Sequence, residues 1–447
     1  MPAQPERHER KPLPIEQMGN EIYGLVERLY PVCRSITGAG VRETLAAIGE
    51  YVDLEIHEVP TGTAVFDWEI PREWAIRDAF IADEAGNRIV DFRSSNLHVV
   101  SYSCPVDVEL PLSELAEHLH TDPEHPDWIP YRTSYYNEDW GFCLTQNQLD
   151  GLEDGRYRAF IDSELFDGSL SYGEFCIPGD TDEEILFFAH CCHPSLCNDN
   201  LSGLAMLAVL ARQLSGQPLR HTLRFIFAPA TIGSITWLAL NEDKLDRVRG
   251  GLVASVLGDS GRFRYKESAQ GDATIDRVCR HVLDQTGADH ELLPFSPWGY
   301  DERQFCSPGI DLPVGRLTRS PNGEYPEYHT SADDLDLVAP EFLGESLRLY
   351  HDVVSCLEAD RTYINNSPNC EPQLGRRGLY RKMGGFQDIE ETKLAMLWML
   401  NQSNGNRSLL DIADKSGLSW KTLDAAAQLL VEHDLLEAAP GAPTGAD

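Results

Sequence analysis

The chain has 447 residues, which is enough for two or three domains with a sizeable hydrophobic core. Its formal net charge of -35 disfavours non-specific attraction to nucleic acid or anionic lipid, and no apolar run approaches the roughly 20 residues that a membrane-spanning helix needs. The charged N-terminal stretch lacks the apolar segment of a signal peptide, and 11 scattered cysteines are typical of reduced thiols. We therefore expect a cytoplasmic protein with neither nucleic acid nor a membrane as its partner.

The first part of the chain, residues 1–60, predicts two helices and then a strand at 54–59. From 61 to 168 the pattern changes to short alternating segments that are broken by Pro, Gly and Asn. Such a pattern is typical of strands joined by turns. We therefore expect a β-rich domain of residues 61–168 that is inserted into a first domain made of residues 1–60 and 169–362.

Between residues 169 and 362 the sequence alternates between apolar strand patterns and helical patterns. The strands are expected at 184–190, 221–229, 250–259 and 311–319, and the helices at 200–214, 232–241, 272–287 and 340–358. Strands that alternate with helices predict an α/β domain with a mostly parallel sheet flanked by helices. Sites in such sheets collect beyond the carboxyl ends of the strands.

Residues 363–385 are rich in Asn, Pro and Gly and are expected to form a linker. Residues 386–440 have the helix order of a winged helix-turn-helix domain. From Gly385 to Asp447 there are 4 Lys or Arg residues against 10 Asp or Glu residues, so the attraction to phosphate expected of a DNA-binding domain is reversed in sign. We interpret this domain as a protein-contact module, and we expect any homo-oligomer to form through it or through the inserted domain.

Polar residues follow the ends of the predicted strands. His190, His193 and Asp199 follow the first strand, Asp259 ends the third, and His329 lies in a loop after the last. Imidazole and carboxylate are ligands that suit zinc and similar divalent ions. The structural alternatives are that Asp259 caps a turn, that His329 belongs to a polar loop, and that the cysteines beside the first strand are inert buried thiols.

The segments "NDNLSG", "GDSG" and "YHTSADD" resemble, in this order, the co-catalytic zinc aminopeptidase superfamily, whose relatives include glutaminyl cyclases. The segments "CHPSLCNDNLSG", "TIGSITWLA" and "EPQLGRRGLY" are more closely similar to a bacterial aminopeptidase-like family with an inserted β-rich domain and a C-terminal winged helix. This resemblance implies the zinc-aminopeptidase-like α/β fold and a metal-dependent hydrolase.

The resemblance also implies the metal ligands. His193, Asp199 and Asp259 are placed around one ion, and Asp199 is able to bridge to a second ion held by His329. His190 competes with His193, because it falls where the strand-end histidine of the superfamily would lie. We favour His193, which belongs to the "CHPS" segment shared with the closer family.

The sequence departs from the superfamily where two glutamates are expected, since residues 228–231 read "APAT". One of these glutamates is a metal ligand in the superfamily, so the second metal site, which contains His329, lacks a ligand here. The three remaining protein ligands and a water predict one zinc ion rather than two. The missing general base is assigned to Glu302, and Asp301 is expected to orient a histidine ligand. Tyr300 and Tyr328, next to these residues and to His329, are expected to contact the substrate.

The leading hypothesis is therefore an aminopeptidase-type hydrolase that cleaves an amide or peptide bond near a free amine in a small substrate by means of a metal-activated water. A metal-binding scaffold without hydrolytic activity is the second hypothesis, supported by the missing glutamates. A cyclase or other acyl-transfer enzyme on the same fold is the third. A DNA-binding regulator ranks last because of the charge.

Overall fold

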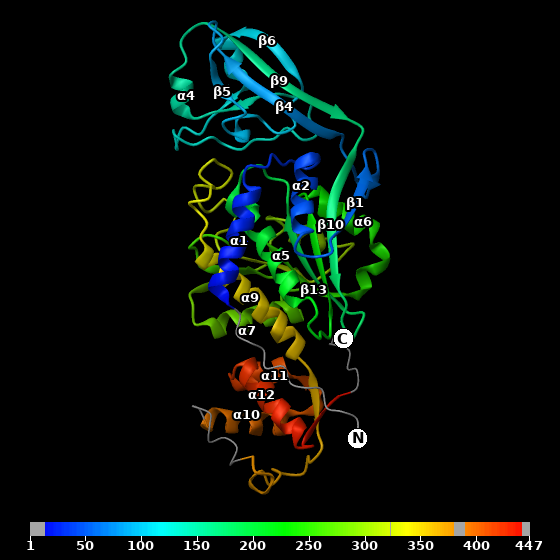
Figure 1. Ribbon diagram of the computed structural model, residues 1–447. Coiled ribbons are helices and arrows are strands. Elements are labelled where there is room, and N and C mark those ends of the chain that lie inside the picture. Colours follow the sequence, from blue (N-terminus) through cyan, green and yellow to red (C-terminus); the bar gives the residue numbers. More distant parts are fainter. Residues whose placement is uncertain (1–13, 322, 380–388, 440–447) are drawn as a thin grey trace.

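The computed structural model of the protein describes residues 14–321, 323–379 and 389–439. The last part of the predicted linker (380–385), and residues 386–388 and 440 of the predicted winged helix, lie outside the described residues. Figure 1 shows three parts along the long axis of the molecule: a β-rich part, a central α/β part and a small helical part.

The central part contains an eight-stranded mixed sheet in the order β1-β10-β12-β11-β13-β16-β14-β15. Its strands are β1 (Glu55–Pro60), β10 (Ser169–Ile177), β11 (Glu184–His190), β12 (Thr222–Ala228), β13 (Val248–Ala254), β14 (Phe263–Lys266), β15 (His290–Leu293) and β16 (Val314–Thr318). The four strands β12, β11, β13 and β16 are parallel, whereas β1, β10 and the β14–β16 pairing are antiparallel. The sheet thus has the expected parallel centre with antiparallel pairings toward its edges.

Helices cover both faces of this sheet, because successive side chains of a strand point to opposite faces. On β11, Phe187 packs into the core on the side of α5 and α9, and Phe188 packs into the core on the side of α6 and α8. The helices are α1 (Ile15–Leu29), α2 (Ala39–Ile48), α5 (Gly203–Leu214), α6 (Ile232–Leu240), α7 (Thr274–Thr286), α8 (Glu302–Phe305) and α9 (Pro340–Ala359). No helix within the described ranges has the length and apolar character needed to cross a membrane.

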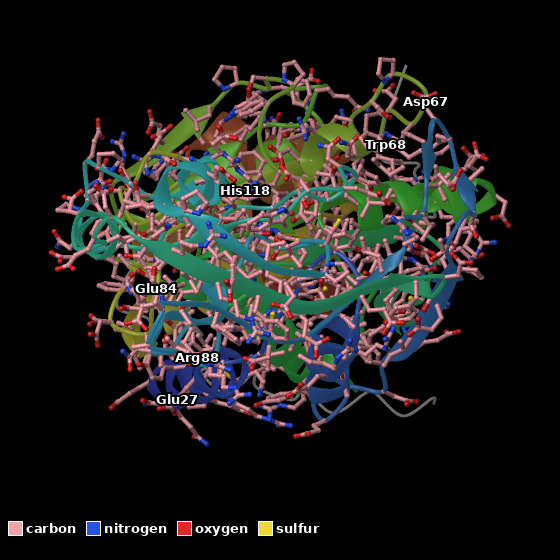
Figure 2. The ribbon with its side chains drawn as sticks, turned by 90° about the horizontal axis from the view of Figure 1, so that it is seen from above. Glu27, Asp67, Trp68, Glu84, Arg88 and His118 are labelled. Carbon is pink, nitrogen blue, oxygen red and sulfur yellow. The ribbon has the colours of Figure 1, made fainter. Side chains whose placement is uncertain are left out.

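The segment between β1 and β10 forms a separate layer with its own small core (Figure 1). Its main sheet has the order β5-β4-β9-β6. The strands and helices are β2 (Ala64–Val65), β3 (Trp68–Glu69), β4 (Glu73–Ala82), β5 (Arg88–Asp91), β6 (Val106–Pro111), α3 (Leu112–Leu115), β7 (Leu119–His120), β8 (Phe142–Cys143), α4 (Gln146–Asp150) and β9 (Arg156–Phe166). Seen from above, this layer lies across the α/β part, with Glu84 and Arg88 at one end (Figure 2), whereas the β2–β3 hairpin packs into the core of the α/β part through Val65.

The C-terminal part has the winged helix order. Its elements are β17 (Thr362–Asn365), α10 (Ile389–Gln402), β18 (Asn404–Ser408), α11 (Leu409–Ser416), α12 (Trp420–Glu432) and β19 (Leu436–Ala438). The three strands form one sheet in the order β18-β17-β19, so residues directly after α9 already belong to this part rather than to a free linker. The exact domain limits stay a prediction.

Helices α1 and α9 approach each other closely at Gly19. A Cβ atom at this position would collide with the main-chain carbonyl of Pro340 and would lie 3.3 Å from the main-chain nitrogen of Gly344. Gly24, on the same helix, has open space where a Cβ would be. On α1, the close contact with α9 therefore depends on the missing side chain at Gly19 and not on the one at Gly24.

These two glycines give a matched pair of substitutions. Gly19→Ala is expected to lower the free energy of unfolding by about 1–3 kcal/mol, because the backbone of α9 must move. Gly24→Ala is expected to raise it by roughly 0.5–1 kcal/mol, because alanine restricts the unfolded chain and favours a helix. Urea unfolding followed by circular dichroism measures both, and equal effects of the two substitutions would contradict the packing described.

Candidate metal centre

The candidate site lies at the carboxyl end of β11, in the middle of the parallel strands. All residues from Glu184 to His190 are buried, and β12 and β13 flank this strand. The chain passes from β11 to β12 and then crosses back to β13, and binding sites of α/β sheets lie where the strand order reverses in this way. Beyond the strand end, His193 lies in a loop and Asp199 in the irregular helical turn Cys197–Ser202 that leads into α5.

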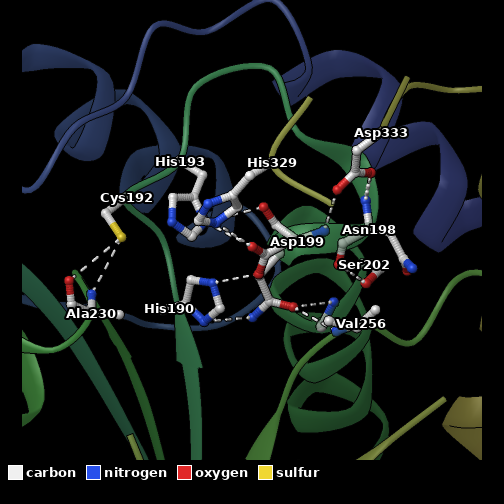
Figure 3. A network of polar contacts seen from close by, with 12 residues as sticks. His190, Cys192, His193, Asn198, Asp199, Ser202, Ala230, Val256, His329 and Asp333 are labelled. Carbon is white, nitrogen blue, oxygen red and sulfur yellow. Dashed lines mark hydrogen bonds and ion pairs between the residues drawn. The ribbon is translucent and has the colours of Figure 1, made fainter. Parts of the chain in front are cut away.

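Three histidines surround the carboxylate of Asp199 (Figure 3). His190 Nε2 lies 3.0 Å from Oδ1, whereas His193 Nδ1 and His329 Nε2 lie 3.4 and 3.1 Å from Oδ2. The rings of His193 and His329 lie edge to face, with centroids 4.9 Å apart. The side chains of His190 and Asp199 are fully buried, while that of His329 is 32% exposed. The site is therefore closed around Asp199 and reaches solvent on the His329 side.

The cluster fits a divalent metal ion. Asp199 Oδ2 and His329 Nε2 are buried and have no hydrogen-bond partner among the described residues, although they lie only 3.1 Å apart. Two such atoms that are close but not aligned with each other are suited to a common ligand between them. The ligand atoms of His190, His193 and Asp199 also lie within 4.8 Å of one another. Nitrogen and oxygen donors of this kind suit zinc.

The protonation of the cluster also suits a metal. Burial lowers the pKa of His193 to about 3, so its imidazole is neutral near pH 7. Burial alone would raise the pKa of Asp199, but the histidines, His193 foremost, outweigh burial and hold this pKa well below its ordinary value. A neutral imidazole and an ionised carboxylate are the forms that bind metal.

Asn200 distinguishes the two histidines that the sequence left in competition. Its Oδ1 accepts two main-chain N–H groups at 3.2 Å, so its Nδ2 donates, and His190 Nδ1 accepts at 3.3 Å. A neutral His190 then carries its proton at Nε2, which donates to Asp199 Oδ1. His193 Nδ1 instead donates to the main-chain carbonyl of Asp199 at 3.2 Å, which places its lone pair at Nε2. This arrangement favours His193 as the ligand and His190 as a hydrogen-bond donor to Asp199.

Asp259 does not join the cluster, contrary to the expectation from the sequence. Its Oδ2 accepts from Asn198 Nδ2 at 2.6 Å, and its Oδ1 accepts from Ser320 Oγ at 2.7 Å and from the main-chain N–H of Gly261 at 2.6 Å. Both oxygens are therefore engaged: Oδ1 closes the turn after β13 through Gly261, and Oδ2 joins that turn to Asn198. These contacts match the alternative interpretation, in which Asp259 stabilises a turn.

Glu302 and Asp301 are buried but are not seen to contact the cluster. Glu302 Oε1 accepts from Lys266 Nζ at 2.8 Å, so the carboxylate is paired with a buried cation. Asp301 Oδ1 accepts from Ser234 Oγ at 2.6 Å, and this bond goes to a serine where a histidine was expected. Burial raises the pKa of Asp301 to about 7.

Tyr300 and Tyr328 lie beside the cluster, and their expected contact with a substrate stays a prediction. The ring of Tyr300 stacks on His190 with centroids 5.2 Å apart, and the ring of Tyr328 stacks on His329 with centroids 3.9 Å apart. Burial and then the charge of Asp199 raise the pKa of both phenols. Both hydroxyls are therefore neutral donors near pH 7.

Two parts of the site were missed from the sequence. Asp333 accepts the main-chain N–H groups of Asn198 at 2.5 Å and of Asp199 at 2.9 Å, and so fixes the turn that carries the carboxylate. Tyr131, from the inserted segment, packs edge-on against His193 and His329. The only signals in the sequence were the two aspartates that end "YHTSADD" and the aromatic residues clustered after residue 130.

The chain is similar to known proteins over most of its length. A family model described as a domain of unknown function (DUF4910) matches residues 23–360, and a winged helix-turn-helix model matches residues 361–438. A Clostridium acetobutylicum protein named "Putative polysaccharide biosynthesis protein with aminopeptidase-like domain" is 51% identical over 421 residues, which are 94% of this chain and 97% of the relative.

Solved structures agree with these matches. A crystal structure described as a "putative peptidase" from Clostridium acetobutylicum has a TM-score of 0.91 at 49% identity and covers 95% of this chain and 97% of its own. The zinc aminopeptidase BSAP from Bacillus subtilis has a TM-score of 0.57 at 14% identity, over 77% of this chain and 95% of its own, so the likeness is one of fold. The expected aminopeptidase-like α/β fold with a C-terminal winged helix is confirmed.

Asp301→Asn tests the buried carboxyl beside the cluster. Its pKa is about 7 in the folded protein against an ordinary value of 3.8, so between these pH values the folded state keeps a proton that the unfolded chain loses. The stability that this group contributes is fully present below its ordinary pKa and is lost as the pH rises toward its folded pKa. We expect the free energy of unfolding to fall more steeply over this window in the wild type than in the variant; parallel urea-unfolding profiles would contradict the assignment.

Proposed function

Because this chain belongs to the DUF4910 family, whose function is unknown, we propose from its site that it is a metal-dependent hydrolase of amide or peptide bonds. The observation that carries the proposal is the convergence of three imidazoles on the buried carboxylate of Asp199, whose Oδ2 and the facing His329 Nε2 lack hydrogen-bond partners in the described part of the chain. The aminopeptidase-like fold supports the reaction class. The free amine beside the cleaved bond remains a prediction made from the resemblance.

We assign one zinc ion to His193, Asp199 and His329. When bound, zinc supplies a Lewis acid for the carbonyl and lowers the pKa of a water molecule. Three protein ligands leave a position for that water, as in other catalytic zinc sites. His190 is left to orient Asp199 through its hydrogen bond to Oδ1, which is the role of partners that lie behind the ligands.

We assign proton transfer to Asp301 rather than to Glu302. Glu302 Oε1 is engaged in a buried ion pair with Lys266 at 2.8 Å, whereas Asp301 has no cationic partner of this kind in the described part of the chain. Asp301 has one buried oxygen without a hydrogen-bond partner among the described residues, and its pKa of about 7 is near the value at which a general base works best. In this role Asp301 accepts a proton from the attacking water and returns it to the leaving nitrogen.

A second part of the proposal concerns the winged helix, which we infer makes protein contacts rather than DNA contacts. The first turn of α12, the helix that reads DNA in such domains, lies against the α/β domain, where the main-chain N–H of Trp420 donates to His281 Nε2 at 3.1 Å. Lys421, in the same turn, pairs with Asp352 of α9 at 2.9 Å. The homo-oligomer stays a prediction.

Zinc content tests the ligand set. Asp199→Ala and His329→Ala are expected to lose stoichiometric zinc, because each removes a donor atom from the ion. Asp259→Asn is the matched control and is expected to keep it, since both Asp259 oxygens bond to other groups. Zinc is measured by plasma mass spectrometry on the purified protein; loss of zinc from Asp259→Asn with retention in Asp199→Ala would remove the site as drawn.

The two neighbouring histidines give a sharper test. His193→Gln is expected to abolish zinc binding, whereas His190→Gln is expected to weaken it by about 10–100-fold, the usual effect of losing a partner behind a ligand. Competition with a chromophoric chelator measures both affinities. The reverse order of effects would assign His190 as the ligand.

A further inference from the structure

The inserted β-rich segment reaches the Asp199 cluster through its backbone. The main-chain N–H of Tyr131 donates to the carbonyl of His329 at 2.7 Å, and that of Ser331 donates to the carbonyl of Ile129 at 2.8 Å. A short antiparallel bridge therefore joins the inserted segment to the loop that carries His329. This pairing fixes one residue, Tyr131, directly against the candidate ligands.

The side chain of Tyr131 lies over two histidines of the cluster. It is only 6% exposed, and its ring meets His193 and His329 edge-on, with centroids 5.3 and 5.1 Å away. Its hydroxyl lies 3.1 Å from that of Tyr135, so the two phenols form a pair. The ring of Tyr131 is therefore held by packing and by the contact between the two hydroxyls, rather than by an ion pair.

Two further phenols complete what we call the tyrosine wall, defined as Tyr131, Tyr300 and Tyr328. Tyr300 is 6% exposed, and its hydroxyl has no hydrogen-bond partner in the described part of the chain. A buried hydroxyl without a partner costs free energy unless a ligand or water satisfies it. The wall thus lines the cluster with three aromatic rings, and Tyr300 adds a buried hydroxyl that is open to a ligand.

Three of the carboxylates near the cluster are already engaged in hydrogen bonds or an ion pair. Both oxygens of Asp333 accept main-chain N–H groups, the oxygens of Asp259 accept from Gly261 and Asn198, and Glu302 Oε1 pairs with Lys266. Strand β12 continues into residues 228–231, which carry no ionisable side chain. Apart from Asp301 and Glu327, which the variants below test, a positively charged group next to the cleaved bond would meet neutral phenols where it needs a counter-charge.

We propose that the tyrosine wall selects an uncharged amide, one whose neighbouring nitrogen is acylated rather than a free ammonium, and that Tyr131 makes the inserted segment part of this selection. The inference rests on the proposed hydrolase function and replaces the free amine expected from the resemblance. An ammonium buried without a counter-charge costs several kcal/mol, whereas an acyl oxygen accepts hydrogen bonds from phenols.

The test compares two probes that share the alanine amide, alaninamide with a free ammonium and N-acetylalaninamide with an acylated, uncharged nitrogen. Calorimetric titration of the zinc-loaded full chain near neutral pH is expected to show the acetylated probe binding at least about tenfold more tightly. Tyr131→Phe keeps the ring and is expected to weaken binding of the acetylated probe by about tenfold with unchanged zinc content, as for the loss of one hydrogen bond to a ligand. Tighter binding of alaninamide, or binding of neither probe, overturns the inference.

Two variants test whether a carboxylate near the cluster provides the counter-charge for an ammonium group of the substrate. Glu327, in the loop before His329, and Asp301 are the remaining acidic candidates, so loss of alaninamide binding in Glu327→Gln or Asp301→Asn would locate an ammonium site and refute the proposal. The p-nitroanilides of alanine and N-acetylalanine separate the two levels of the argument. Preferential cleavage of the alanine substrate overturns the substrate class and leaves the hydrolase standing, whereas binding of N-acetylalaninamide without cleavage of either substrate refutes the hydrolase and leaves the selection standing.

Discussion

The structure around the site depends on one constraint, the complete burial of the Asp199 carboxylate. A buried charge persists only when other groups compensate it, and here histidine nitrogens reach both of its oxygens. The backbone is held as firmly as the side chain, because Asp333 accepts the N–H groups of Asn198 and Asp199. Strand β11, the turn before α5 and the loop before α9 therefore meet at a single side chain.

The inserted segment changes what the α/β fold alone would provide. A sheet of this kind supplies the strand ends and the ligands, but Tyr131 comes from a different layer of the molecule and lies against two of those ligands. The inserted segment also contributes Leu97, which packs with Tyr131 and with Leu196 of the ligand loop. The two layers thus contribute separately, since the α/β layer positions the candidate donor atoms and the inserted layer shapes their surroundings.

The sequence was sufficient for features that depend on local pattern. Strand β11 and the short distance along the chain between His190, His193 and Asp199 follow directly from an apolar run that ends in polar residues. The sequence did not predict the direction in which the site side chains point. Asp259 turns toward Ser320 and Asn198, and Glu302 pairs with Lys266, because of partners far away in the sequence. The contact between Tyr131 and His329 was hidden for the same reason.

The winged helix extends this logic to the other end of α9. This helix begins at Pro340, shortly after the loop that carries His329, and its far half is held by α12 through the pair of Lys421 and Asp352. On the neighbouring helix α7, Arg277 lies 2.8 Å from Asp411 and 2.6 Å from Asp414 of α11. Two of the acidic residues that would repel DNA, Asp411 and Asp414, thus bind the α/β domain. The negatively charged winged helix is therefore better suited to contact α7 and α9 of the α/β domain than to approach a phosphate backbone.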